Sequence, residues 1–581
     1  MKTKNDTRAQ ELFGNTAVKK AIWIVTIPSL LTAMMAGLYS FADQIFIQQF
    51  VPQTRQVLIN NQIGEIASYM TNQSLTFNDY FSLFEKYNQL LPNENLARIT
   101  ANSVVSTTNA AFQPLIIFSN SIVFLVPVGA SIYYTKCISK KMELTAKNLW
   151  ATMFWTTVVL ALIATLMSFI FVGAGLLKLL AGKTELDSAK AMALGMSQSE
   201  IDNLQDFYNA AHKLSLKWAA NYIYIYASGT ILQGLSWLFA YFIRAEGYNS
   251  FVMWIGIAAN LINISLDALF IIVFKMGVLG GIWATIVGWT FNLLAYVIYT
   301  AIQHKKGHLW MSLGQLIKFQ FSWKMLLPTF LLGFSGFIRS FGVAFSFAII
   351  NILLSKPGFA DPGHFQFYWA KSAPIITLFA ISIFGINDGA RSLLAYNYAL
   401  RNFKRCKEIY LWTLLVAVSY SLIVYVFVFF TANNLWVIAL NVNNELIPAT
   451  SRFIQIMTLR VVAISFSISS LLVFQATNDV EKSILTSMWE NFICFAVIMP
   501  IGLGLAYWAF LGYNNALAAN WIIISTYIVN SLIASLTLLA WSWHYLTKKL
   551  PKIDQSKVSW SRKIEHQFFA HAQLVEQKNS Q

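Results

Sequence analysis

Two carboxylates lie inside long apolar stretches of the sequence, and their chemistry is the first guide to function. Asp43 stands near the end of the run IPSLLTAMMAGLYSFADQIFI, residues 27–47, and Asp267 lies in the run FVMWIGIAANLINISLDALFIIVF, residues 251–274. A charge in hydrocarbon costs ~2.5 to 3.5 kcal/mol even on a lenient insertion scale, so such residues mark functional sites by default. Because Asp267 is close to its predicted helix end, a plain hydrogen-bonding role is the alternative for this residue.

Polar side chains accompany Asp267. Asn263 precedes it by four residues, which places both side chains on one helical face, and Asn260 is one turn earlier. Amide and carboxylate oxygens suit a proton or a small hard cation. Thr285 in the next apolar segment is a further candidate, although a threonine there can also bond to its own helix backbone. The pattern predicts a site for a proton or a small hard cation.

The composition describes the kind of protein that holds these residues. The chain has 581 residues, of which 57% are hydrophobic and only 11% are charged. A soluble chain carries about 25% charged residues, so this is a polytopic membrane protein. The net charge is +16, and most Lys and Arg residues fall in segments expected on the cytoplasmic side. This distribution indicates positive-inside topology and not nucleic-acid binding.

Apolar segments of about 20 residues or more predict an all-α membrane protein with twelve transmembrane helices. An even number places both termini on one side, the cytoplasm, with residues 1–20 as the N-terminal segment and no cleavable signal peptide. The segments are 21–50, 104–135, 148–182, 217–243, 249–274, 278–303, 325–354, 366–398, 409–431, 450–477, 482–509 and 516–547.

A weak internal repeat divides these helices into two pseudo-symmetric bundles of six. Pro28, Tyr39, Ser40 and Phe41 correspond to Pro328, Arg339, Ser340 and Phe341, and Ala245 and Asn260 correspond to Ala476 and Asn491. Such repeats are typical of secondary transporters. Asp43 and Asp267 map to Val343 and Ile498, so only the first bundle carries this acidic pair.

The repeat sets the expected organisation along the chain. The first bundle covers 21–303 and the second covers 325–547, with the cytoplasmic linker 304–324 between them. We expect the long outer loops 51–103 and 183–216 to form partly helical caps that could gate the substrate path. The basic tail, 548–581, is expected to lie on the anionic inner surface of the membrane.

Signals for other classes of protein fail on inspection. Gly182-Lys183-Thr184 lacks the upstream glycine of a phosphate-binding loop, and no Walker motif is present. His304 and His308 have a metal-like spacing without an acidic partner, and the three cysteines include no CxxC pair. We therefore predict that the protein is not an enzyme and has no catalytic residues. We also predict that it has no metal site and no organic cofactor, and that it does not bind nucleic acid.

Five strings of residues occur in the order typical of one transporter family. They are IPSLLTAMMAGLYSFADQIFI, FIRAEGYN (242–249), NISLDALFI (263–271), KMGVLGGIWAT (275–285) and YNYALRN (396–402). Together they resemble the multidrug and toxic compound extrusion (MATE) family, over roughly residues 20–545 apart from the long outer loops. The resemblance implies a V-shaped transporter that exports bulky organic cations by antiport with H⁺ or Na⁺.

The resemblance also implies roles for individual residues. In the prokaryotic branch with the acidic cluster in the first bundle, the counterpart of Asp43 is the principal acid. Counterparts of Asn263, Asp267, Thr285 and Tyr222 complete the ion-coupling cluster, although Tyr222 can equally belong to an interfacial aromatic belt. The substrate cavity is expected to include Tyr39, Asn260, Gln233, Arg339 and Asp388. We expect a monomer in the plasma membrane, with a small organic cation as substrate.

Departures from the family keep a second function open. Glu490 replaces an arginine that many members carry early in span 11, and Asn387-Asp388-Gly389 replaces a glutamine-containing run. Arg339, Arg452 and Arg460 fall within predicted spans, where they could bind phosphate. The alternative is therefore a flippase of the same superfamily that moves a lipid-linked or polymeric substrate.

Overall fold

The computed structural model describes residues 8–51, 64–71, 75–91, 96, 98–181, 184–355, 364–440, 442, 444–513, 516–552 and 560–578. These residues form helices and connections, and no strand occurs among them. Parts of the expected N-terminal segment, of the loop 51–103 and of the tail 548–581, Lys557 included, lie outside the described residues.

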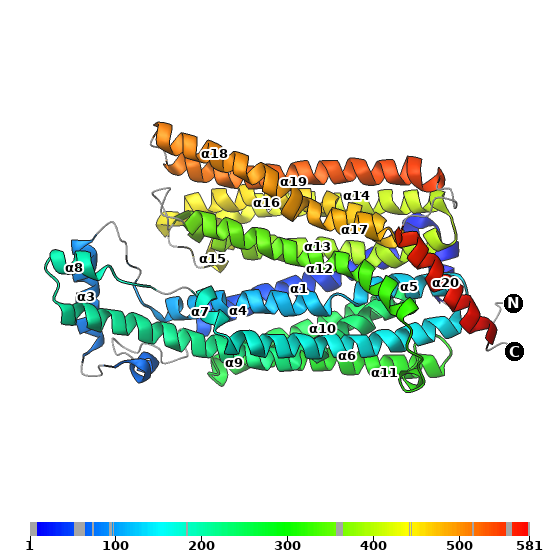
Figure 1. Ribbon diagram of the computed structural model, residues 1–581, viewed down its shortest axis with the longest axis horizontal. Helices are drawn as coiled ribbons and strands as arrows, with labels where there is room; N and C mark the ends of the chain where they lie inside the picture. Colours follow the sequence, from blue (N-terminus) through cyan, green and yellow to red (C-terminus); the bar gives the residue numbers. More distant parts are fainter. Residues whose placement is uncertain are drawn as a thin grey trace.

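The first helical lobe, called the N-lobe below, occupies the lower half of Figure 1. α9 packs against α4, α6 and α11, and α10 packs against α1 and α11. Its long helices are α1 (Val18–Ile45), α4 (Ala101–Val123), α5 (Pro127–Ser139), α6 (Glu143–Gly173), α9 (Gln198–Ala245), α10 (Asn249–Asp267) and α11 (Val278–Lys305).

The second lobe, the C-lobe, lies above it, and both chain termini emerge at the same end of the molecule (Figure 1). α16 is central in this lobe because it packs against α13, α14, α17 and α19. The C-lobe helices are α12 (Trp323–Ser355), α13 (His364–Ala399), α14 (Phe403–Thr431), α16 (Ile447–Ala476), α17 (Val480–Met488), α18 (Phe495–Tyr513) and α19 (Ala516–His544).

Eleven helical segments of the described chain are apolar and long enough to cross a membrane. The expected span 217–243 is not among them, although it lies in the N-lobe bundle as part of α9. The helix that contains this span is longer than the span itself, because α9 begins at Gln198 and has 48 residues, which makes it about 70 Å long. Ser197 and Glu200 form a capping box that starts the helix there.

The outer segments pack on the part of α9 that projects beyond the lobes at the end opposite the termini (Figure 1). α3 (Phe77–Leu90) lies against α9, with the rings of Tyr80 and Phe207 stacked at 4.6 Å. Lys86 and Glu200 form an ion pair of 2.8 Å. α8 (Ser188–Ala193) also contacts α9, so the described parts of both predicted loops form helical structure on this extension.

A break in the expected span 104–135 brings the two lobes together. α4 ends at Val123 and α5 begins at Pro127, whose ring lacks the N–H that a continuous helix would need. The backbone exposed at this break packs on α12: a Cβ added at Gly333 would lie 1.7 Å from the Leu125 carbonyl oxygen. A Cβ added at Gly129 would lie 2.0 Å from the Thr329 carbonyl oxygen. Only glycine therefore permits the two backbones to approach so closely at either position.

A second contact between the lobes runs along α1 and α13, and glycine again allows the backbones to meet. A Cβ at Gly37 would lie 2.8 Å from the Leu378 carbonyl oxygen, and one at Gly389 would lie 2.4 Å from that of Val25. Small residues let membrane helices approach closely where apolar packing alone gives little drive. Because α1 also packs on α10, one helix connects the N-lobe interior to the C-lobe.

The C-terminal helix α20 (Trp560–Lys578) crosses the end of the molecule that carries both termini and contacts α6 and α12 (Figure 1). Glu565 pairs with the fully buried Lys136 of α5 at 2.9 Å, and Phe568 and Phe569 are buried. The aromatic side chains Phe568 and Phe569 of the tail are therefore covered by protein. The attraction of the tail to anionic lipid remains a prediction.

Glu246, directly after α9, holds the linker between the lobes. Its Oε1 accepts hydrogen bonds from the backbone N–H groups of Trp310 and Met311 and from the Tyr134 hydroxyl, at 2.8, 3.1 and 2.5 Å. Glu246 is fully buried, and this burial raises the pKa of its carboxyl to about 7. The linker position thus depends on a group that titrates near neutral pH.

Candidate functional site

The two predicted acidic residues meet in the interior of the N-lobe. Asp43 lies two residues before the end of α1, and Asp267 is the last residue of α10 before a short π-helix, Ala268–Val273. Asp43 is 8% exposed and Asp267 is fully buried. The two carboxylates are close enough to interact electrostatically. Tertiary packing therefore brings together two charges that are 224 residues apart in sequence.

The third side of this site is α11, which approaches Asp43 at a glycine. A Cβ added at Gly281 would lie 2.7 Å from Asp43 Oδ1, an oxygen that has no hydrogen-bond partner among the described residues. One oxygen of the carboxylate is therefore available for a proton or an ion next to a bare stretch of helix backbone. No feature of the local sequence identified Gly281 as part of the site.

Amide and hydroxyl groups lie beside the two carboxylates. Asn263 Nδ2 donates a hydrogen bond of 3.2 Å to Thr285 Oγ1, and both side chains are buried. Tyr222 on α9 stacks on Phe112 with 4.0 Å between ring centroids and lies within electrostatic range of Asp43. We call Asp43, Asp267, Asn263, Thr285 and Tyr222 the acidic cluster.

The residues predicted to line a substrate cavity fall into separate places. Tyr39 is half-buried on α1, within electrostatic range of Asp43 and Asp267, and Asn260 is half-buried on α10. Gln233 belongs to a neighbouring group on α9, where the Tyr226 hydroxyl bonds to its Oε1 at 3.3 Å. Tyr39 is thus adjacent to the acidic cluster. Gln233 lies two helical turns after Tyr226 on α9.

Asp388 lies between the lobes and away from the acidic cluster. The Tyr241 hydroxyl of α9 donates to Asp388 Oδ2 at 2.6 Å, and Arg391 Nη1 lies 2.6 Å from Oδ1. This small network joins α9 of the N-lobe to α13 of the C-lobe. The sequence contained Tyr241 and Arg391, but nothing in it showed that they meet Asp388.

Arg339 occupies a buried ionic cluster of the C-lobe. Its Nη2 lies 3.2 Å from Glu490 Oε2, and Arg460 Nη2 lies 3.6 Å from Glu490 Oε1. Arg452, the third arginine considered for phosphate binding, is exposed on α16 and takes no part in this cluster. Glu490 therefore serves as the counter-charge of two arginines.

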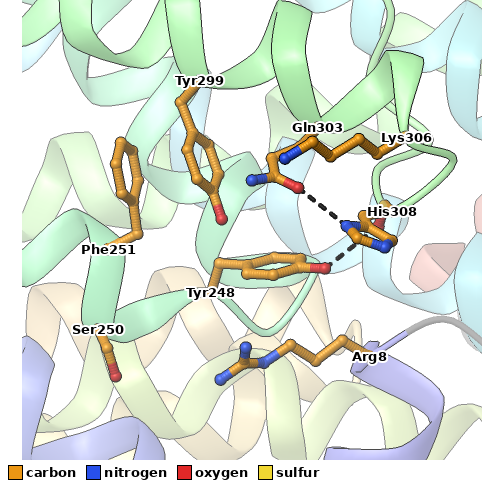
Figure 2. A pocket seen from close by; sticks show the side chains of 8 residues that line it. All are labelled: Arg8, Tyr248, Ser250, Phe251, Tyr299, Gln303, Lys306 and His308. Carbon is orange, nitrogen blue, oxygen red and sulfur yellow. Dashed lines mark hydrogen bonds between the residues drawn. The ribbon is translucent and has the colours of Figure 1, made fainter.

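A cavity of about 430 Å³ has none of the residues of these clusters in its lining, and Figure 2 shows the side chains that line it. It is lined by the basic residues Arg8, Lys306 and His308 and by Tyr248, Phe251 and Tyr299, among others. No carboxylate lines it, so it does not form part of the acidic cluster. Within the described ranges, no group of three or more His, Cys, Asp or Glu residues is arranged to hold a metal ion.

Comparison with known sequences finds a family match in the C-lobe and relatives that cover most of the chain. Residues 370–503 match the MatE family. The chain is 27% identical over 519 residues to the uncharacterized MG447 homolog of Mycoplasmoides gallisepticum, covering 85% of this chain and 83% of that one. It is 24% identical over 511 residues to the uncharacterized protein MG447 of Mycoplasma genitalium, covering 86% and 89%.

Solved structures have the same fold. A MATE protein in complex with MaL6 superposes with a TM-score of 0.67 at 16% identity, covering 94% of this chain and all of that one. The outward-facing conformation of a multidrug resistance MATE family transporter of the MOP superfamily gives 0.67 at 17% identity, covering 95% and 100%. A MOP superfamily transporter from Pyrococcus furiosus gives 0.66 at 16% identity, covering 94% and 100%. The predicted V-shaped fold of twelve transmembrane helices is confirmed.

Proposed function

We propose that this chain is a membrane transporter of the MATE family that works as a secondary antiporter, on the basis of the MatE match to residues 370–503 and the shared fold. It exports organic cations across the plasma membrane in exchange for H⁺ or Na⁺, as a monomer with both termini in the cytoplasm. The observation that carries this proposal is the buried pair of Asp43 and Asp267 beside amide and hydroxyl groups.

The pair supplies the exchange chemistry. Two carboxylates in a low-dielectric interior repel each other, so a proton or a cation bound between them is strongly favoured. Once Asp43 is neutralised, the site attracts an organic cation less. Entry of the coupling ion and departure of the substrate thereby become alternatives, which is what antiport requires.

The fold offers a route from this site to the rest of the transporter. α1 carries Asp43, packs on α10 inside the N-lobe and contacts α13 of the C-lobe. Pro28 interrupts the hydrogen bonds of α1, and the Thr32 hydroxyl bonds to the Pro28 carbonyl oxygen at 2.8 Å. A shift of α1 about Pro28 on ion binding would change both contacts and drive alternating access.

The membrane potential supplies enough energy for such a cycle. One charge moving inward contributes ~2.3 kcal/mol per 100 mV. At 100 mV this corresponds to a roughly fifty-fold concentration ratio for a cycle that moves one net charge inward, as when two coupling ions enter for each monovalent organic cation that leaves. No nucleotide is needed for this drive.

The test is uptake of a fluorescent lipophilic cation into inside-out proteoliposomes, with a proton gradient in one arm and a sodium gradient in the other. We expect uptake in one arm, and Asp43→Asn should abolish it while the protein stays folded. Asp202→Asn is the matched control, because Asp202 is an exposed carboxylate on the outer extension of α9. Export by Asp43→Asn at the wild-type rate would refute the role of the acidic cluster.

A flippase remains the second candidate because Arg339 and Arg460 place positive charge inside the C-lobe. Arg452 no longer supports it, since this residue is exposed. If both ion gradients fail to drive cation uptake, transfer of a fluorescent lipid-linked sugar between leaflets is the assay that separates the two functions.

A further inference from the structure

Two arginines share one carboxylate in the interior of the C-lobe. Arg339 on α12 and Arg460 on α16 are 3% and 1% exposed, and Glu490 on the π-helix Trp489–Cys494 is fully buried. Among the described residues, Glu490 is the one acid in ion-pair distance of either arginine. The cluster therefore carries one excess positive charge in a lobe that spans the membrane. A buried charge without a counter-charge costs several kcal/mol, so this excess needs an explanation.

The carboxylate of Glu490 has no capacity left to neutralise more charge. Its Oε2 contacts Arg339 Nη2 and accepts a hydrogen bond of 3.0 Å from the Ser467 hydroxyl. Its Oε1 lies next to Arg460 and accepts one of 3.2 Å from the Ser531 hydroxyl. Both oxygens are thus used within the lobe.

The two arginines differ in how completely they are bound. Arg460 donates from Nε to Ser531 at 2.9 Å, and its guanidinium lies 4.4 Å above the ring centre of Tyr527. Arg339 uses only Nη2, toward Glu490 and Ser467, while its Nε and Nη1 have no hydrogen-bond partner in the described part of the chain. The unused donors of this cluster therefore belong to Arg339.

A neighbouring amide adds a further donor. Asn491, adjacent to Glu490, has a buried Nδ2 without a partner among the described residues, although its Oδ1 accepts a hydrogen bond of 3.1 Å from Ser346. Guanidinium and amide N–H groups left unsatisfied inside a protein favour an acceptor that carries negative charge.

We propose that the C-lobe contains an anion-binding site formed by Arg339 and Asn491, which takes a monovalent anionic group. The internal repeat equates Arg339 with Tyr39 and Asn491 with Asn260, so the site is the counterpart in the C-lobe of the region around the acidic cluster. The occupant is either an inorganic anion such as chloride or the phosphate or carboxylate of a substrate. An anionic group carried by the substrate rests on the proposed transport function. In that case the substrate is a zwitterion whose cationic end faces the N-lobe.

The test is binding to the full-length protein in neutral-lipid nanodiscs without any ion gradient. In one arm chloride replaces gluconate at constant ionic strength, and in the other dimethyl phosphate is added. A ligand that binds only the folded state raises the unfolding temperature in a saturable way, which tryptophan fluorescence records. We expect saturation in at least one arm, and an apparent Kd at least tenfold weaker in Arg339→Gln. Arg452→Gln, which removes an exposed arginine, should leave the Kd unchanged.

Each outcome decides the proposal. A chloride response that Arg339→Gln removes identifies an inorganic anion, and a response to dimethyl phosphate alone identifies a group borne by the substrate. The proposed site is refuted if the unfolding temperature of the wild type shows no saturable rise, or if the Kd is unchanged in Arg339→Gln. If the variant does not fold, the wild-type titration alone decides. Anion binding without gradient-driven cation uptake would remove the antiporter proposal and leave this site standing.

Discussion

Replacing Gly281 by alanine tests the acidic cluster without touching its charges. The new methyl group would lie 2.7 Å from Asp43 Oδ1, whereas ordinary van der Waals contact begins at 3.4 Å. The atom in its way is the end of a side chain and not backbone. Rotation of the Asp43 carboxylate can therefore relieve the clash while the helices keep their positions. We expect the strain to weaken ion binding and to leave the fold intact.

The size of the effect follows from the cost of overpacking, typically ~1 to 3 kcal/mol. If this cost falls on the ion-bound geometry of Asp43, the half-saturating concentration of the coupling ion rises roughly 5- to 150-fold, because each ~1.4 kcal/mol is a factor of ten. Alanine also gains ~1 kcal/mol of helix propensity over glycine, so the unfolding temperature should not fall.

Gly288→Ala is the matched control on the same helix. Its methyl group would meet the Ala259 carbonyl oxygen at 3.5 Å and Asn263 Cβ at 3.6 Å, which are ordinary contacts. Both variants gain the same helix propensity, but only the methyl group at position 281 comes closer to a side chain of the acidic cluster than an ordinary van der Waals contact. The assay is gradient-driven cation uptake as a function of coupling-ion concentration. A half-saturating concentration within twofold of wild type in Gly281→Ala, or equal impairment in Gly288→Ala, would refute the reasoning.

Three further predictions concern the elements that hold the lobes together. Gly333→Ala places a methyl group 1.7 Å from a backbone carbonyl of the N-lobe, so the helices must move apart, and we expect a loss of ~3 kcal/mol, the upper end of the usual cost of overpacking, seen as a lower unfolding temperature. Glu565→Gln leaves Lys136 as a buried charge without its ion-pair partner and should destabilise the protein by roughly 3 kcal/mol in chemical unfolding. For Glu246, the pKa of about 7 in the folded protein exceeds the ordinary value of 4.5. The free energy of unfolding should therefore fall as the pH rises from about 4.5 to about 7 and then level off. Glu246→Gln removes the titrating group and should flatten this profile.

Each of these predictions has its own control. Gly336→Ala meets only ordinary contacts of 3.5 Å or more, so an equal loss there would contradict the steric account of Gly333. If Lys136→Met fails to restore stability to Glu565→Gln, the buried charge is not the cause. A slope between pH 4.5 and pH 7 that persists in Glu246→Gln would assign it to another group.

Much of the fold was determined by local sequence. Long apolar runs separated by polar segments fixed the membrane class and the positions of most helices, because hydrocarbon accepts only helices with satisfied backbones. The early start of α9 was also readable, since Ser197 and Glu200 form a capping box, although the apolar-length criterion identified only the span 217–243. Likewise, spacing by four residues correctly placed Asn263 and Asp267 on one buried face.

Only the tertiary structure determines the contacts between segments that are distant in sequence. Gly281 approaches Asp43, Tyr241 bonds to Asp388, and Glu490 pairs with two arginines that lie on different helices. No periodicity encodes these partners, because each depends on the rotation and depth at which two helices pack. Sequence determined which polar side chains enter the membrane, since their cost there is intrinsic. Packing determined which charges they meet, because electrostatic energy depends on distances that only the assembled lobes define.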